Sequence, residues 1–172
     1  MKLKHHIICG SIVSLCLFPK IGFFSGIFWA ASVLIDVDHY IDFLYRNRLT
    51  NFSFKKMFDY CNVIIGWNNR PYLLGLSIFH TGEVIGGTYF ISVWIDSDIG
   101  NAIFLGMVFH MFLDVLYLLR RGMLFRRVFL LLEYFIRKNL MIRNGLSPDV
   151  IYKEALIVAN VNMPRIHKLQ GK

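Results

Sequence analysis

The most constraining feature of the sequence is residues 102–120, an apolar run that nevertheless contains His110 and Asp114. Side chains four residues apart share one face of a helix. Burying ionisable groups in an apolar environment costs several kcal/mol unless they have partners. The run therefore predicts a helix that is apolar enough to lie in a membrane and whose His–Asp pair contacts other polar groups of the chain.

The composition favours an integral membrane protein. Hydrophobic residues make up 56% of the 172-residue chain and charged residues only 17%, whereas soluble proteins have about 25% charged residues. The net charge of +8 raises nucleic acid as a partner, but the basic residues gather at the ends of apolar runs. That distribution is typical of membrane flanks. Nucleic acid is therefore disfavoured as a partner, and the lipid bilayer is expected.

Two apolar segments, residues 7–18 and 21–35, flank the dipeptide Pro19-Lys20. Each is shorter than the ~20 residues of a full membrane span. One long kinked helix and a re-entrant hairpin are both compatible with this pattern. We favour the hairpin because it returns Asp36 to the level of His6. The first segment resembles a secretory signal, but no small-x-small cleavage site follows it, so we expect it to be retained.

A second pair of apolar segments, residues 72–95 and 99–119, is joined by an acidic turn. His80 and Asp114 lie at equal sequence distances from this turn, so an antiparallel helical pair would bring them level. Glu83 would share a helix face with His80. The open ends of both hairpins are rich in basic residues, and the positive-inside rule therefore places the polar residues at the cytoplasmic face.

The predicted fold class is thus an all-α, multi-pass inner-membrane protein with two antiparallel helical hairpins, about four membrane-inserted helices in all. We expect residues 123–172 to hold a C-terminal amphipathic helix, a short helix and a basic tail. The amphipathic helix, residues 123–141, could lie on the membrane surface or pack on the other helices. Its polar arc contains Arg126, Arg127, Glu133, Arg137 and Lys138. We divide the chain into a membrane-embedded metal-site domain, residues 1–122, and this C-terminal region.

Histidines and carboxylates recur at the predicted open ends of the hairpins, where five of the six histidines fall. Each has a simple alternative explanation, such as a buried hydrogen-bonded pair for His110 and Asp114, but their common level favours a metal site. Imidazole and carboxylate without thiolate suit zinc best, with manganese or iron as alternatives. The predicted ligands are His6, Asp36, His39, His80, His110 and Asp114. Asp38 or Glu83 would serve as general base or as a hydrogen-bond partner of a ligand.

A bound divalent ion would lower the pKa of a coordinated water and polarise a carbonyl or phosphoryl oxygen. The sequence therefore predicts a membrane-bound, metal-dependent hydrolase of an ester or phosphoester, with a lipid or amphiphilic substrate. Arg46, Arg48 and Arg120 are candidates for binding a substrate phosphate. The alternative is a non-catalytic small membrane protein whose cluster is a structural network or a metal-binding feature.

The order of these motifs resembles the membrane-bound, metal-dependent hydrolases typified by the YdjM-like inner-membrane proteins. The motifs that carry the resemblance are His6, Asp36-Val37-Asp38-His39, His80 and His110 with Asp114. The resemblance covers roughly residues 4–121 and implies metal-dependent hydrolysis at the inner membrane. The central motif departs from the family pattern, because only one histidine and no arginine stand there.

Overall fold

The computed structural model describes residues 3–67, 74–124 and 127–161. Within these ranges the regular elements are helices, with one isolated bridge between Gly75 and Arg127. The predicted all-α class is confirmed.

The contacts of the chain separate into two units. The first unit comprises Met1–Asp38 and Leu74–Leu140, and the second comprises His39–Leu73 and Met141–Lys172. The boundary predicted after residue 122 falls inside the first unit, because this unit continues to Leu140.

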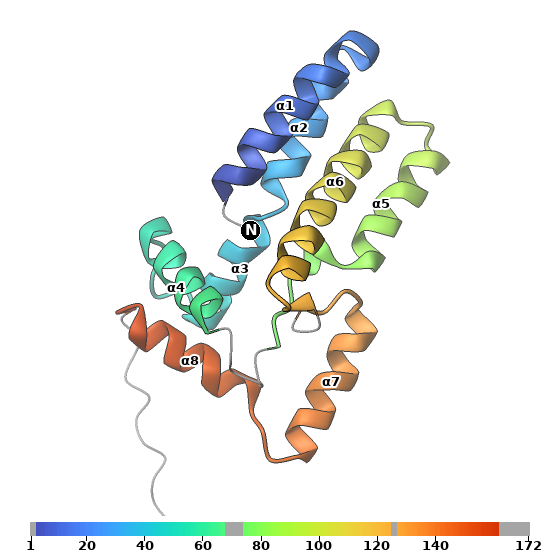
Figure 1. The fold of residues 1–172 in the computed structure, drawn as a ribbon. Coiled ribbons are helices and arrows are strands. Elements are labelled where there is room, and N and C mark those ends of the chain that lie inside the picture. Colours follow the sequence, from blue (N-terminus) through green and yellow to red (C-terminus); the bar gives the residue numbers. More distant parts are fainter. Residues whose placement is uncertain (1–2, 68–73, 125–126, 162–172) are drawn as a thin grey trace, which may run out of the picture. The chain divides into compact units, whose positions relative to one another are not determined.

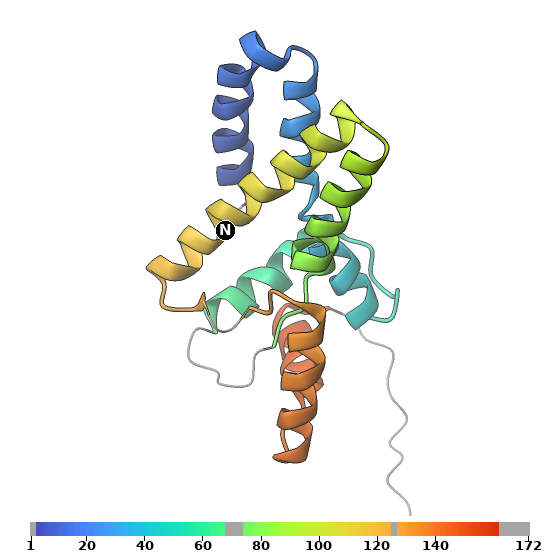
Figure 2. The same cartoon turned by 90° about the vertical axis from the view of Figure 1, so that its right-hand side faces the viewer.

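The first hairpin is formed by α1 (Leu3–Ile21) and α2 (Phe24–Leu34), which lie side by side in both views (Figures 1 and 2). The hairpin interpretation is confirmed, but the predicted position of the turn is wrong. Pro19 lies inside α1, and the chain reverses at Gly22, which has a φ of +53°. Glycine adopts this left-handed conformation without steric cost, and it commonly ends helices in this way.

The second hairpin is formed by α5 (Gly82–Trp94) and α6 (Asp98–Arg120). The Ser97 side chain begins α6 by accepting a hydrogen bond from Gly100 N at 3.1 Å. The helix predicted from residue 72 is shorter than expected. His80 ends a 3₁₀ turn, η1 (Ile78–His80), that precedes α5, so the prediction that His80 and Glu83 share one helix face is wrong.

Helix α6 contacts both α2 and α5, and α2 contacts α1. The first unit is therefore a layer of helices in the order α1, α2, α6 and α5, as Figure 1 shows. Small residues allow the close approach, as is common where helices pack without much side-chain volume between them. Gly106 of α6 lies against the backbone of α2 at Phe28.

Helix α7 (Leu131–Arg143) begins later than the amphipathic helix predicted from residue 123. Residues 125–126, which include the predicted polar residue Arg126, lie outside the described ranges. Arg127 precedes α7 rather than lying on its polar arc, and Glu133 and Arg137 form an i,i+4 ion pair at 3.0 Å. The helix begins only at Leu131, where two carboxylates accept hydrogen bonds from the first amides: Phe129 N donates to Glu133 Oε2 at 3.0 Å and Leu131 N to Glu83 Oε1 at 2.8 Å.

The second unit packs α4 (Phe54–Gly66) and α8 (Pro148–Val158) with the latter part of α3 (Val37–Arg46). Its buried core includes Phe43 and Leu156. Helix α8 is the short helix predicted for the C-terminal region, and Pro148 stands in its first turn, where the missing amide hydrogen of proline is not needed.

Among the described residues, α6 alone is long and apolar enough to cross a membrane, judged by length and composition. It has 23 residues, about 35 Å at 1.5 Å per residue. Helices α2 and α5 have 11 and 13 residues, or about 17 and 20 Å, against a hydrocarbon core of ~30 Å. The structure thus supports one candidate span, and the multi-pass arrangement stays a prediction.

Candidate metal site

His110 and Asp114 lie on α6, and both side chains are buried. His110 Nδ1 is 2.7 Å from the carbonyl oxygen of Ser32 on α2. A carbonyl can only accept a hydrogen bond, so Nδ1 carries the proton and donates it. In a neutral imidazole this leaves Nε2 with its lone pair, ready to bind a cation.

His80 is oriented in the same way by a carboxylate. Its Nδ1 is 2.8 Å from Asp38 Oδ2, and the Phe79 amide donates to the same oxygen at 3.2 Å. Asp38 stands in the first turn of α3, where the helix dipole favours an acidic side chain. Its contact fits the role of orienting a ligand, one of the two roles predicted for it, because a carboxylate behind an imidazole is common in metal sites.

The two oriented imidazoles meet through their Nε2 atoms, which are 3.0 Å apart. Asp36 Oδ1 lies 3.4 Å from Nε2 of His110 and 3.5 Å from Nε2 of His80. Two lone pairs at this distance repel unless a cation lies between them. Ligands at zinc–nitrogen bond lengths are about 3.3–3.4 Å apart in a tetrahedral site. The two Asp36 distances match this spacing, whereas the 3.0 Å between the Nε2 atoms is shorter and also fits a proton shared between them.

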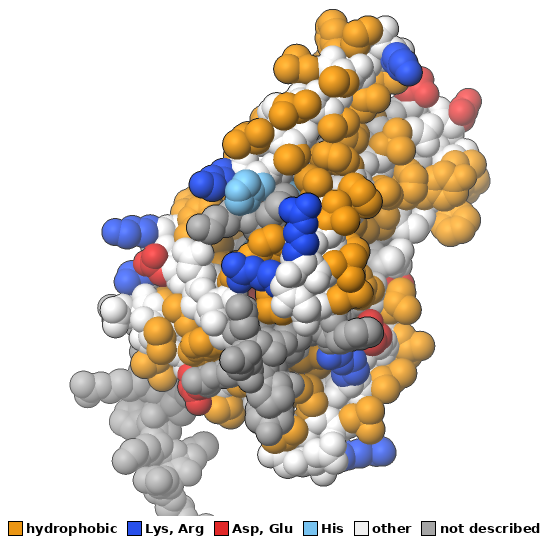
Figure 3. All heavy atoms as spheres, viewed as in Figure 1, with side chains coloured by type: hydrophobic (Ala, Val, Ile, Leu, Met, Phe, Trp, Pro, Cys, Tyr) orange, Lys and Arg blue, Asp and Glu red, His pale blue; other side chains and the backbone are white. Residues whose placement is uncertain are grey.

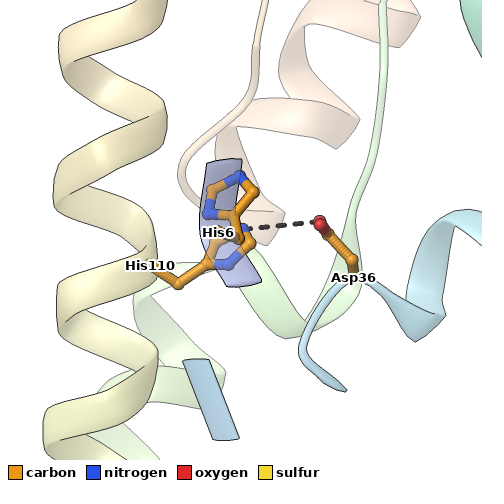
Figure 4. Close-up of side chains that lie close together, drawn as sticks. All are labelled: His6, Asp36 and His110. Atoms are coloured by element: carbon orange, nitrogen blue, oxygen red, sulfur yellow. Dashed lines mark ion pairs between the residues drawn. The ribbon is translucent and has the colours of Figure 1, made fainter. Parts of the chain in front are cut away.

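His6 of α1 lies against this group (Figure 4). Its ring stacks on His110, with centroids 3.8 Å apart and planes 11° apart. Its Nε2 is 3.2 Å from Asp114 Oδ1 without hydrogen-bond geometry, and neither ring nitrogen has a hydrogen-bond partner among the described residues. Buried polar atoms normally have partners, so His6 is well suited to bind a ligand that the protein chain itself does not supply.

Within the first unit, two sets of potential ligands each converge to within 4.8 Å, namely His6, Asp36 and His110, and His80, His110 and Asp114. His110 belongs to both. Five of the six predicted ligands therefore lie together in one unit, contributed by α1, η1, α6 and the turn between α2 and α3.

The sixth predicted ligand, His39, is the first residue of the second unit, and its role stays a prediction. Glu83 does not join the cluster. It is exposed, and its Oε1 accepts a hydrogen bond from the backbone amide of Leu131 at 2.8 Å. Arg120 is exposed at the end of α6.

Arg46 and Arg48 belong to the second unit. Arg46 binds Asp42 at 3.1 Å and Asp149 at 2.8 Å, and its guanidinium lies 3.8 Å from the centre of the Tyr152 ring. Burial lowers the pKa of Arg46, but Asp42, Tyr152 and Tyr60 together outweigh this effect and the pKa is raised overall. Arg46 thus already has two carboxylate partners, and the predicted phosphate-binding roles of Arg46 and Arg48 stay predictions.

Sequence reasoning missed Arg127. Its Nη1 donates to Asp114 Oδ2, which places a positive charge beside the carboxylates of the cluster. The amphipathic pattern of residues 123–141 predicts one helix with Arg127 in its polar arc. The run contains no glycine or proline, so its composition gives no signal that its first residues are not helical.

Replacing Asp38 with alanine is expected to lower metal affinity about 10- to 100-fold without unfolding the protein, because His80 would lose the partner that fixes its tautomer and orientation. Zinc affinity measured by competition with a chromophoric chelator checks this. Asp98→Ala, an exposed acid at the far end of α6, is the control and should bind as the wild type does. Equal affinities in both variants would contradict the orienting role.

In comparisons with family models, curated proteins and solved structures, nothing matches this chain. The described fold and cluster define a helical protein with a buried histidine–carboxylate site. The resemblance to the YdjM-like hydrolases rests on the order of its motifs and stays a prediction.

Proposed function

We propose that this protein is a membrane-inserted, metal-dependent hydrolase that cleaves an ester or phosphoester bond, with zinc as the preferred ion and manganese or iron as alternatives. One observation carries the proposal. The Nδ1 atoms of His80 and His110 each contact an acceptor, and their Nε2 atoms face each other at 3.0 Å, with a carboxylate oxygen within 3.5 Å of both. A metal ion or a proton between the two Nε2 atoms would stabilise this arrangement, and the Asp36 oxygen near both atoms supports a metal ion.

His80, His110 and Asp36 would hold the ion, with His6 or Asp114 completing the coordination. The bound ion would supply an activated water and polarise the bond to be cleaved. Asp36 is the most accessible carboxylate of the group, with 17% of its side chain exposed against 3–4% for Asp38 and Asp114. The substrate would therefore approach beside Asp36, and whichever carboxylate does not bind the ion could accept a proton from water.

The surface of the first unit supports membrane insertion. Large apolar side chains are exposed along its helices, and Figure 3 shows them covering much of the surface over α1, α2, α5 and α6. Phe23 is 78% exposed and Trp94 is 86% exposed. A continuous apolar surface of this kind is typical of contact with lipid or another apolar partner.

The position of the cluster suits an amphiphilic substrate. His110 lies twelve residues along α6 from Asp98, or about 18 Å, near the middle of this helix. His6 lies near the start of α1 and His80 directly before α5, so the cluster is at the open ends of these two helices, away from their turns. Basic flanks on that side would place it at the cytoplasmic face of the inner membrane. A lipid-like substrate could then keep its apolar part in the bilayer while its polar group enters the site.

The neighbouring histidines His5 and His6 provide the test, because the first is exposed and the second buried in the cluster. Detergent-purified wild type should carry close to one divalent ion per chain by mass spectrometry, or take it up on reconstitution, and should hydrolyse model esters or phosphoesters. His6→Ala should bind metal at least ~10-fold more weakly, whereas His5→Ala should not differ from wild type.

A monodisperse wild type that takes up no zinc, manganese or iron would contradict the proposal. The contacts of His80, His110 and Arg127 would then serve the alternative function, a structural network that joins helices in a non-catalytic membrane protein. A proton shared between the two Nε2 atoms would stabilise that arrangement.

A further inference from the structure

The guanidinium of Arg127 has donors that the cluster does not use. Nη1 donates to Asp114, but Nε and Nη2 are buried and have no hydrogen-bond partner among the described residues. Only 13% of the side chain is exposed. A buried cationic donor without a partner is costly, so these two atoms are suited to a ligand outside the protein chain.

Nε and Nη2 form one edge of the planar guanidinium. Their two N–H groups point in the same direction, the geometry that binds two oxygens of a phosphate or carboxylate at once. The backbone of Arg127 bridges to Gly75, and the ion pair with Asp114 holds the other end of the side chain. The free edge is thus held beside a proposed metal ligand rather than on a mobile surface arm.

We propose that Nε and Nη2 of Arg127 bind the non-bridging oxygens of a phosphoryl group, so that the substrate is a phosphoester rather than a carboxylic ester. This inference rests on the proposed function for its reaction but not for the binding itself. A carboxylic ester offers a neutral carbonyl oxygen and no pair of anionic oxygens, so it cannot form two parallel charge-assisted hydrogen bonds with this edge. A phosphoryl group can satisfy both donors in that way.

The pairing of Arg127 with Asp114 adds to the argument. Asp114 Oδ2 lies 3.7 Å from His110 Nε2, so the guanidinium reaches the site through a residue that also approaches the proposed metal. Asp36, Asp38 and Asp114 would otherwise repel an anionic substrate. Arg127 and the bound ion together offset that charge, which reduces the electrostatic repulsion between an anionic substrate and the carboxylates.

The test uses inorganic phosphate as the probe, with the full-length protein in detergent both loaded with zinc and treated with chelator. Arg127→Lys keeps a positive charge for Asp114 but removes the two-donor edge. Phosphate affinity by calorimetry should fall about 10-fold or more while zinc content stays unchanged. Arg143→Lys, an exposed arginine at the end of α7, should leave both values unchanged.

The outcomes separate the two proposals. If the wild type binds phosphate but takes up no metal, and Arg127→Lys loses the phosphate binding, the anion site is supported and the hydrolase proposal is contradicted. If Arg127→Lys keeps its metal, its esterase activity and the phosphate affinity of the wild type, the anion site is contradicted and the hydrolase proposal is unaffected. If Arg127→Lys does not fold, phenylglyoxal labelling of the wild type decides, because phosphate should protect Arg127 and not Arg143.

The source of the phosphoryl group is distinguished by a second comparison. Micelles containing phosphatidic acid, micelles containing diacylglycerol and a water-soluble phosphomonoester are compared as competitors of phosphate. Competition by phosphatidic acid alone would indicate a lipid headgroup, and competition by both phosphates would indicate a soluble one as well. Competition by diacylglycerol alone would contradict the inference.

Discussion

Replacing His110 with alanine is expected to remove the metal ion and reduce hydrolysis by about 10³-fold, on the basis of the several kcal/mol that a catalytic ion contributes to the transition state. Within the first unit, His110 is the one residue shared by both converging ligand sets. Its loss leaves neither set complete, whereas loss of His6 or His80 leaves one. Metal content by mass spectrometry and initial rates on a phosphoester measure the two effects.

The same substitution also removes the hydrogen bond to the Ser32 carbonyl, which costs about 1–3 kcal/mol when the acceptor stays buried. His110→Gln, which is closer in volume, separates the two effects. A folded Gln variant without metal or activity would support the catalytic site. If both variants retain metal but unfold at much lower temperature than wild type, the cluster is a structural network and the hydrolase proposal fails.

The convergence of His80 and Asp114 could be predicted because it depends on little more than helix rise. Two antiparallel segments joined by a short turn bring residues at equal distances from that turn to one level. The prediction succeeded although η1 and the extended chain before it replaced part of the expected helix. The segment before α5 still brings His80 to the middle of α6, where the Nε2 atoms of His80 and His110 are 3.0 Å apart.

The partners within the cluster could not be predicted from the sequence. The pairing of His80 with Asp38 rather than Asp36 depends on how η1 lies against the start of α3, and periodicity carries no information on that contact. Arg127 was missed for a related reason. Its role depends on the chain turning back after Gly122, and a helical projection of residues 123–141 assigns the same charge to solvent or lipid.

The reversal of the first hairpin at Gly22 shows how a local rule can point to the wrong residue. Proline was treated as the breaker because it lacks an amide hydrogen. Near the end of α1 this removes a single helical hydrogen bond, and Pro19 is exposed, where its ring has room. A positive φ is the stricter requirement of the turn, and Gly22 meets it.

Substitution of Gly106 is expected to have the second large effect, because it would separate the two helices that hold the site. A Cβ atom at this position would lie 2.4 Å from the carbonyl oxygen of Phe28, 2.8 Å from Ala31 Cβ and 3.1 Å from Ser32 N. Two of these neighbours are backbone atoms of α2, which cannot rotate away. Helices α2 and α6 must therefore move apart, and His110 would lose its short contact with the adjoining Ser32 carbonyl.

Gly106→Ala is consequently expected to destabilise the protein by about 1–3 kcal/mol, the usual cost of overpacking, and to weaken zinc binding about 10-fold or more through the displaced His110. Helix propensity acts in the opposite direction, since alanine is favoured over glycine by about 1 kcal/mol, but the backbone clash is larger.

Gly86→Ala on α5 is the matched control, because its added Cβ would have no neighbour within 4 Å, and it should be neutral or slightly stabilising. Thermal unfolding in detergent and zinc competition measure both variants. A Gly106→Ala protein as stable as Gly86→Ala, with wild-type zinc affinity, would show that the site does not depend on the close approach of α2 and α6.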